Sequence, residues 1–426
     1  MPFLKRILSF SKTNSQPTAS ALRTSSAFPA SGLPSVANSQ GASQAAAELS
    51  ETLGPALEQI DLDGDVKAQI GLFLDQLDQE ASKYANSQLN HELYPEWDCA
   101  EADARLISTA FQGAQSVYNI PATEDSSTNL ADTVQRRTVP SVAGTIKAST
   151  FTRITTEHGT VLVIAIRGSA SVVDHVVNAN YKPANAHHFI DIARSNPQLW
   201  AGVTLEAHAG FLKSAEALAP VVSEEISKYI GQHGEKSHVL FTGHSAGGAV
   251  ASLLFLRHIC SQPLNQSTRF SCITFGAPPV VTLPIPIDSN YLCLNIINEF
   301  DLVSRADGAY KNCLVDLAQS MYGEPTTTKP VWSFDTDISS HEDEPWQEKA
   351  IWPTSSSCYS HVGARIVFSM RPDVALPGSL RLHAIEVPQE DFERLLFCRI
   401  SVHKRVCYAQ RVELFMERKL NQQTEN

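Results

Sequence analysis

A short apolar strand that runs directly into an apolar helix constrains this chain more than any other feature. Residues 237–256 read S-H-V-L-F-T-G-H-S-A-G-G-A-V-A-S-L-L-F-L, so a G-x-S-x-G pattern joins the strand to the helix. In that context the pattern is typical of a nucleophile elbow, a strained turn whose small neighbours let backbone and helix approach closely. We predict that Ser245 is a nucleophile and that the helix after it directs backbone N–H groups at a developing oxyanion. The alternative is a chance match in a loop rich in glycine and serine.

The surrounding patterns predict an α/β fold. Strand-like and helix-like segments alternate along the chain, which favours a mainly parallel central sheet flanked by helices. The strands are expected at residues 149–155, 161–166, 269–275 and 292–297. The helices are expected at residues 102–117 and 207–230 and, with an interruption around 398–402, at residues 391–420.

Composition narrows the possible functions. The 426 residues, 43% of them hydrophobic, can bury a large core. The net charge of -12 argues against nucleic-acid binding, which requires a basic face. None of the eight cysteines forms a C-x-x-C pair, so we expect neither a zinc site nor a thioredoxin-like motif.

Three parts are predicted along the chain. Residues 1–47 are basic and rich in Ser, Thr and Pro, so we expect disorder, although residues 2–12 can form a basic amphipathic helix. Residues 48–94 are predicted to be an acidic helical extension, and residues 95–426 the catalytic α/β domain, with an insertion at about 307–360. Without a membrane-spanning run or a secretory signal, we expect an intracellular, cytoplasmic protein. Peripheral membrane association and mitochondrial targeting both stay open.

Residues 170–190 combine a short amphipathic helix with a loop next to the expected site. A surface connection is the plainest interpretation, and a lid over the site is the one we favour.

A serine hydrolase of this topology orders its triad as Ser, then acid, then His. Asp301 follows the strand at residues 292–297 and is the expected acid, with Asp307 as the fallback. Four histidines follow Asp301. His341 lies in the acidic part of the insertion and is the weakest candidate, whereas local chemistry leaves the other three open: His361, His383 and His403.

Five motifs, in this order along the chain, resemble those of the class 3 lipase family, the fungal lipase-like α/β-hydrolases. They are V-L-V-I-A-I-R-G-S at 161–169, H-A-G-F at 208–211, T-G-H-S-A-G-G at 242–248, T-F-G-A-P at 274–278 and N-E-F-D-L-V-S-R at 298–305. The resemblance covers roughly residues 95–415. Two positions depart from the family pattern: Pro279 and Ser304 stand where an arginine and a proline are usual.

The resemblance implies roles for particular residues. Asp301 matches the acid, and Ser169 matches the oxyanion-hole position, with the Ala246 N–H as the second donor. The family's H-x4-Y pattern fits His403 to Tyr408, so His403 is the expected base, ahead of His361 and then His383. The segment Tyr359 to Gly363 resembles a Y-x-H-x-G motif whose histidine is not catalytic.

The resemblance also implies an activity. It predicts a cofactor-free serine ester hydrolase of lipid substrates at a membrane or droplet surface. Such an enzyme would be an acylglycerol lipase or a phospholipase A1, working through an acyl-enzyme. The alternatives are a lipase-like scaffold or signalling protein with little catalysis, and an acyltransferase.

Overall fold

The computed structural model describes most of the chain from residue 74 onward. The described ranges are 74–119, 127–131, 134–139, 148–156, 159–168, 182–195, 197–200, 202–234, 237–261, 268–321, 349–373 and 375–424. The predicted disordered segment 1–47, most of the acidic extension and most of the predicted lid lie outside these ranges, as do Ser169 and His341.

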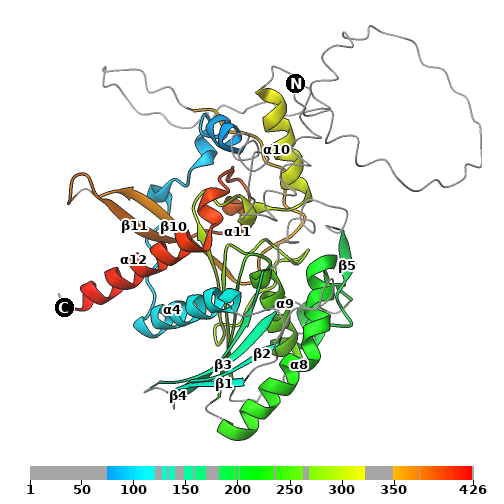
Figure 1. Cartoon of the computed structure of the whole chain (residues 1–426). Coiled ribbons are helices and arrows are strands. Elements are labelled where there is room, and N and C mark those ends of the chain that lie inside the picture. Colours follow the sequence, from blue (N-terminus) through cyan, green and yellow to red (C-terminus); the bar gives the residue numbers. More distant parts are fainter. Residues whose placement is uncertain are drawn as a thin grey trace, which may run out of the picture. The chain divides into compact units, whose positions relative to one another are not determined.

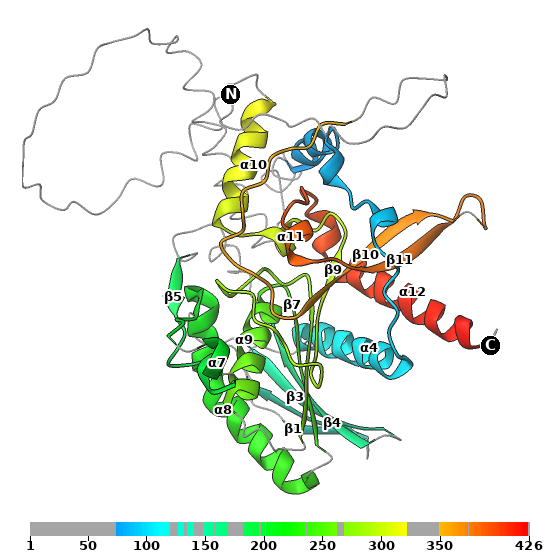
Figure 2. The same cartoon turned by 180° about the vertical axis from the view of Figure 1, so that it is seen from behind.

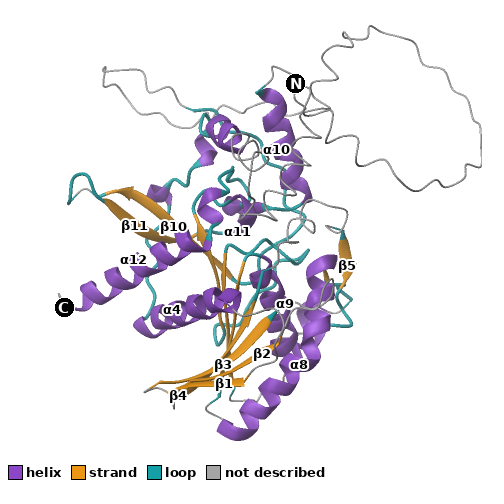
Figure 3. Cartoon of the chain, in the orientation of Figure 1, coloured by secondary structure: helices purple, strands orange, loops and turns teal. Residues whose placement is uncertain are grey.

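Nine strands of the described residues form one mixed sheet in the order β1-β2-β3-β4-β7-β8-β9-β10-β11. Strands β4, β7, β8, β9 and β10 run parallel, and the strands at both margins pair antiparallel, which confirms the predicted mainly parallel core (Figure 3). The bounds are β1 Ser127–Ala131, β2 Val134–Val139, β3 Ser149–Thr156, β4 Gly159–Ile166, β7 His238–His244, β8 Arg269–Phe275, β9 Leu292–Asn298, β10 Ala364–Pro372 and β11 Leu380–Glu386.

Helices cover both faces of this sheet. Helices α8 (Ala209–His233) and α9 (Ala246–Ser261) lie on one face, and α4 (Glu101–Ser116) and α12 (Arg405–Thr424) on the other (Figures 1 and 2). Side chains of β4 alternate between the two layers: Leu162 and Ile164 pack with the α8 and α9 side chains, and Val163 packs with those of α4 and α12. Burial on both faces explains why this strand is apolar throughout.

The remaining elements are short or lie at the carboxyl ends of the strands. They are η1 Ala85–Ser87, η2 His91–Leu93, η3 Val117–Asn119, β5 Pro183–Asn185, α6 Ile192–Ser195, α7 Pro197–Trp200, β6 Glu206–His208, η6 Leu302–Arg305, α10 Gly308–Ser320, α11 Gln389–Phe392 and η7 Ser401–His403. Strand β5 pairs with β6, so the end of the predicted lid segment is a strand. Among the described helices, none combines the length and apolarity needed to cross a bilayer.

The predicted insertion at 307–360 is more regular at its start than expected. Helix α10 occupies residues 308–320 and buries five side chains in the core: Tyr310, Cys313, Leu314, Leu317 and Ala318. Asp307 caps this helix by accepting a hydrogen bond from the Tyr310 N–H at 2.8 Å. Residues 322–348 of the insertion lie outside the described part.

Residues 74–94 are integrated into the α/β domain, although the predicted boundary at residue 95 separates them from it. Leu74, Leu77 and Ala81 lie in the same apolar cluster as α8 and α9. Leu89 is tied to a buried ion pair: its N–H donates to Glu299 at 2.9 Å, and its carbonyl accepts from Arg371 at 3.0 Å. The segment therefore completes the core of the domain.

Candidate active site

The Ser245 turn joins β7 to α9. Ser245 has φ 59, a left-handed conformation that is strained for a residue with a side chain. Its N–H donates to the Phe275 carbonyl at 2.9 Å, and its own carbonyl accepts from the Gly248 N–H at 2.9 Å. Hydrogen bonds to a neighbouring strand and to the helix start thus hold the strained residue in place.

The glycines of the pattern permit this turn sterically. A Cβ on Gly243 would lie 2.4 Å from the carbonyl carbon of Gly247. A Cβ on Gly247 would lie 2.1 Å from the Ile166 carbonyl oxygen and 2.7 Å from the Gly168 nitrogen. The end of β4 therefore packs directly on the turn, and any side chain at either glycine would force the backbone apart.

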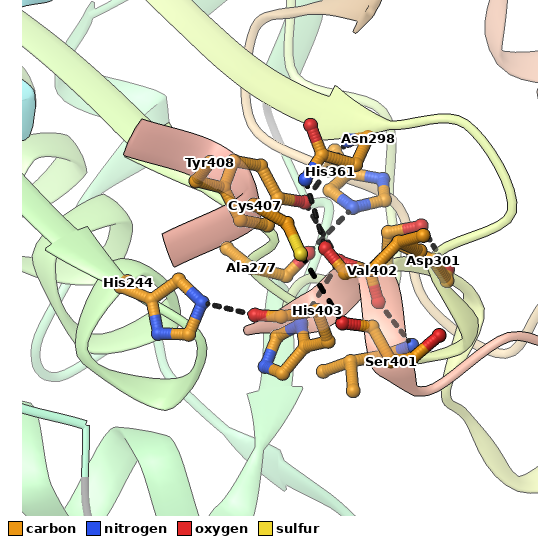
Figure 4. A network of polar contacts seen from close by, with 12 residues as sticks. His244, Ala277, Asn298, Asp301, His361, Ser401, Val402, His403, Cys407 and Tyr408 are labelled. Carbon is orange, nitrogen blue, oxygen red and sulfur yellow. Dashed lines mark hydrogen bonds and ion pairs between the residues drawn. The ribbon is translucent and has the colours of Figure 1, made fainter. Parts of the chain in front are cut away.

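Asp301 and His403 form a buried pair beside this turn. His403 Nδ1 lies 2.8 Å from Asp301 Oδ2, and both side chains are almost completely buried (Figure 4). Asp301 Oδ1 accepts the Val303 N–H at 2.9 Å, which orients the carboxylate. Because a carboxylate oxygen accepts from Nδ1–H, the neutral ring carries its free lone pair on Nε2.

Gly276 links the two halves of the site. It follows Phe275, whose carbonyl binds Ser245, and it has φ 56. A Cβ at Gly276 would lie 2.8 Å from Asp301 Oδ2 and 3.0 Å from His403 Nδ1. The structure thus brings Ser245, Asp301 and His403 to one turn at the end of β8.

Two further side chains support His403 and Asp301. The Tyr408 hydroxyl donates to Asp301 Oδ2 at 2.6 Å and accepts the Asn298 N–H at 3.0 Å. Burial, reinforced by Asp301, raises the pKa of Tyr408 well above its usual value, so the hydroxyl stays protonated as a donor. His244 Nε2 donates to the His403 carbonyl at 2.8 Å, and the two rings lie 4.6 Å apart.

The electrostatics of His244 follow from its surroundings. Burial, and then the charge of His403, lower the pKa of His244 well below its usual value, so its ring stays neutral. Sequence reasoning missed the contacts of His244 and Tyr408. The H-x4-Y spacing was the available signal for Tyr408, and nothing local signalled His244.

The alternative residues lie in other environments. His361 is buried and donates from Nε2 to the Ala277 carbonyl at 3.0 Å, and burial lowers its pKa to about 3. His383 sits on β11, with Nδ1 3.8 Å from Glu96. The second oxygen of Asp307 accepts the Cys358 N–H at 2.6 Å. None of the three contacts the Asp301–His403 pair, whereas Ala246 lies at the start of α9 and is fully buried.

A mainly parallel sheet with a strained serine turn between β7 and α9 defines an α/β-hydrolase type of domain. Comparison with known families is consistent with this class. Residues 163–311 match the model of the family described as lipase (class 3). This part of the chain, from β4 to the start of α10, is therefore similar to the class 3 lipases, which confirms the resemblance seen in the motifs.

Two plant relatives match shorter stretches. The chain is 26% identical over 118 residues to a protein of Arabidopsis thaliana named phospholipase A1 PLIP2, chloroplastic, a match that covers 28% of this chain and 15% of that one. It is 30% identical over 71 residues to phospholipase A1 PLIP1, chloroplastic, of the same organism, covering 17% and 11% respectively. The chain therefore spans less than a sixth of the length of these relatives.

Solved structures of fungal lipases are weakly similar. A lipase from Rhizopus microsporus var. chinensis superposes with a TM-score of 0.40 at 15% identity, covering 75% of this chain and 94% of that one. A Rhizomucor miehei lipase in complex with its propeptide gives a TM-score of 0.41 at 15% identity, covering 75% and 85%.

Proposed function

We propose that this protein is a serine ester hydrolase that acts on lipid esters. The observation that carries the proposal is the Asp301–His403 pair, joined at 2.8 Å, at the turn whose backbone holds Ser245. The family match to class 3 lipases and the plant relatives named phospholipase A1 support the same chemistry.

In the proposed reaction, Ser245 attacks the acyl carbonyl carbon while His403 Nε2 accepts the serine proton. The C–O bond to the leaving alcohol then breaks, and His403 returns the proton to that alcohol. Water, deprotonated by the same ring, attacks the acyl-enzyme, the ester bond to Ser245 breaks, and His403 returns the proton to the Ser245 oxygen as the fatty acid leaves. Asp301 keeps Nδ1 protonated and stabilises the imidazolium between these steps.

The oxyanion is assigned to two donors in this proposal: the Ala246 N–H and Ser169. Each such donor contributes on the order of 3 kcal/mol when it is preorganised in a site that excludes water. The substrate is an acylglycerol or a phospholipid, met at a membrane or droplet surface. Residues 170–190 remain the hypothetical lid over the site.

Labelling with a fluorophosphonate, which reacts with activated serines, tests the proposal. The wild type should be labelled and should hydrolyse long-chain p-nitrophenyl esters, and Ser245→Ala should lose both properties. Ser252→Ala is the matched control, because Ser252 is a buried serine on α9 whose hydroxyl donates to the Gly248 carbonyl at 3.0 Å. A folded wild type that neither reacts nor hydrolyses would overturn the proposal and favour a scaffold role.

A further inference from the structure

Two arginines flank a single tyrosine beside the candidate site. Arg167 follows β4, Arg405 is the first residue of α12, and Tyr118 lies in η3. The guanidinium carbon of Arg405 is 3.8 Å from the centre of the Tyr118 ring, and that of Arg167 is 5.4 Å from it. The aromatic ring thus gathers two cations from segments that are far apart in sequence.

This cluster adjoins the proposed catalytic residues. The Tyr118 ring is 6.4 Å from the His244 ring, which itself lies 4.6 Å from the His403 ring. The Tyr118 hydroxyl lies against Gly168, since a Cβ there would be 2.4 Å away from it. The Tyr118 cluster is therefore separated from the ring of the proposed base by one intervening ring, that of His244.

The two guanidiniums have no internal counter-charge within the part of the chain that the structure describes. Two other arginines of the domain are paired with carboxylates, Arg371 with Glu299 at 2.6 Å and Arg399 with Asp78 at 2.7 Å. Arg305 and Arg411 instead donate to backbone carbonyls. Arg167 and Arg405 are half-buried, and neither forms an ion pair or side-chain hydrogen bond there. Half-buried charges are costly without a partner, so an anion bound between the two guanidiniums would stabilise both.

The position of Arg405 strengthens this argument. It stands in the first turn of α12, where the helix dipole is positive and a cation is unfavourable by about 0.3–1 kcal/mol. The chain as a whole carries a net charge of -12, so a local excess of positive charge is not a general property of its surface. Two arginines that form no ion pair among the described residues are suited to a ligand that carries negative charge.

We propose that Arg167 and Arg405, held on the ring of Tyr118, bind the phosphate of a glycerophospholipid while its acyl ester lies at Ser245. This inference rests on the proposed ester hydrolase function. Guanidinium groups match phosphate oxygens in a bidentate geometry. A phospholipid carries its phosphate diester on the same glycerol unit as the ester, and a neutral acylglycerol has no such group. The cluster would thereby select phospholipids over neutral lipids.

The first test measures specificity. The wild type and Arg405→Gln are compared for kcat/KM on a short-chain phosphatidylcholine and on the diacylglycerol with the same acyl chains. The ratio of the two values should fall about tenfold or more in the variant, as expected when hydrogen bonds to one charged group are lost. An unchanged ratio overturns the proposal.

Two variants separate specific binding from general electrostatics. Lys404→Gln removes the same charge from the exposed neighbouring residue and should leave the ratio unchanged. Arg405→Lys keeps the charge but loses the planar fork, so its ratio should lie between those of wild type and Arg405→Gln. If Lys404→Gln lowers the ratio as much as Arg405→Gln, the effect is nonspecific charge and the subsite is refuted.

A binding measurement distinguishes failure of the subsite from failure of the proposed function. Calorimetry with Ser245→Ala gives the Kd of the short-chain phosphatidylcholine, which should weaken at least tenfold when Arg405→Gln or Arg167→Gln is added. If the wild type is inactive on both lipids but this shift occurs, the hydrolase proposal fails and the subsite stands. An equal Kd for the lipid in all proteins refutes the subsite. If inorganic phosphate binds to Ser245→Ala as tightly as the lipid does, the cluster is a site for free phosphate and the phospholipid proposal is refuted.

Discussion

The turn that carries Ser245 and the loop that carries His403 meet at Gly276, yet the chain assembles them in different ways. The serine turn is set by a few consecutive residues and by the end of one neighbouring strand. The histidine loop depends on hydrogen bonds between distant segments, such as the His403–Asp301 contact and the Asn298 amide to the Val402 carbonyl at 2.8 Å. The conformation of the Ser245 turn is thus determined by neighbouring residues in the sequence. The position of His403 is determined by partners about a hundred residues away.

The largest expected effect separates His403, which is paired with Asp301, from another buried histidine, His361. His403→Ala should lower kcat/KM for ester hydrolysis on the order of 10⁴-fold, because it removes the proposed base. His361→Ala should change kcat/KM by less than about tenfold, because His361 binds only a backbone carbonyl. Steady-state hydrolysis of a p-nitrophenyl ester measures both values. Equal losses of kcat/KM in the two variants would contradict the assignment of His403 as the base.

A smaller effect, on the free energy of unfolding, tests whether the turn at Ser245 requires its glycines. Gly247→Ala should reduce the free energy of unfolding by about 3 kcal/mol, since its Cβ would clash with the backbone at the end of β4. Gly231→Ala is the matched control, because no atom lies within 4 Å of its Cβ position in α8, and it should stabilise the helix by about 0.5–1 kcal/mol. Urea unfolding measures both changes. A loss below 1 kcal/mol at Gly247 would show that the turn relaxes.

Acid should destabilise the fold through buried neutral histidines. The pKa of His361 is lowered to about 3 by burial, and an unfolded histidine has a pKa near 6.5. Between these values the unfolded chain binds the extra proton, so stability falls as the pH falls below about 6.5. From pH 7 to pH 5 this one residue should cost about 2 kcal/mol. The unfolding free energy of His361→Gln should accordingly be less sensitive to pH by that amount, and identical pH dependences would contradict the assignment.

The smallest predicted effect concerns Tyr408, a positioning residue. Tyr408→Phe removes the hydrogen bond to Asp301 together with the one from the Asn298 N–H, and it should lower kcat about tenfold with little change in KM. The split between kcat and KM is the informative measurement, because a purely structural role would change the unfolding free energy and leave kcat intact. Phe415→Leu, a buried apolar change on the same helix, is the control for packing.

The sequence predicted the sheet and the serine turn because both rest on local patterns. An apolar run such as residues 161–166 can be buried on two faces only in a central strand, and the glycines around Ser245 are required by the turn. The histidine was different, since local chemistry left His361, His383 and His403 open and only the family resemblance favoured His403. Its partners Asp301 and Asn298 lie about a hundred residues away, beyond any local pattern.

Helix α10 was missed for another reason. Its buried positions, Tyr310, Cys313, Leu314 and Leu317, follow helical spacing, but the polar residues after Ser320 outweighed that signal. The packing of residues 74–94 into the domain could not be predicted either, because polar partners such as Glu299, Arg371 and Arg399 lie 210 to 321 residues further along the chain.

The contacts of Leu89 have a consequence for synthesis. Its N–H and carbonyl partners, Glu299 and Arg371, follow it by 210 and 282 residues. At about 5–20 residues per second, a ribosome needs roughly 15–60 seconds to deliver Arg371 after Leu89. During that interval the apolar side chains of residues 74–89 have no finished core to enter. The nascent chain therefore has to be shielded from aggregation for most of its own translation.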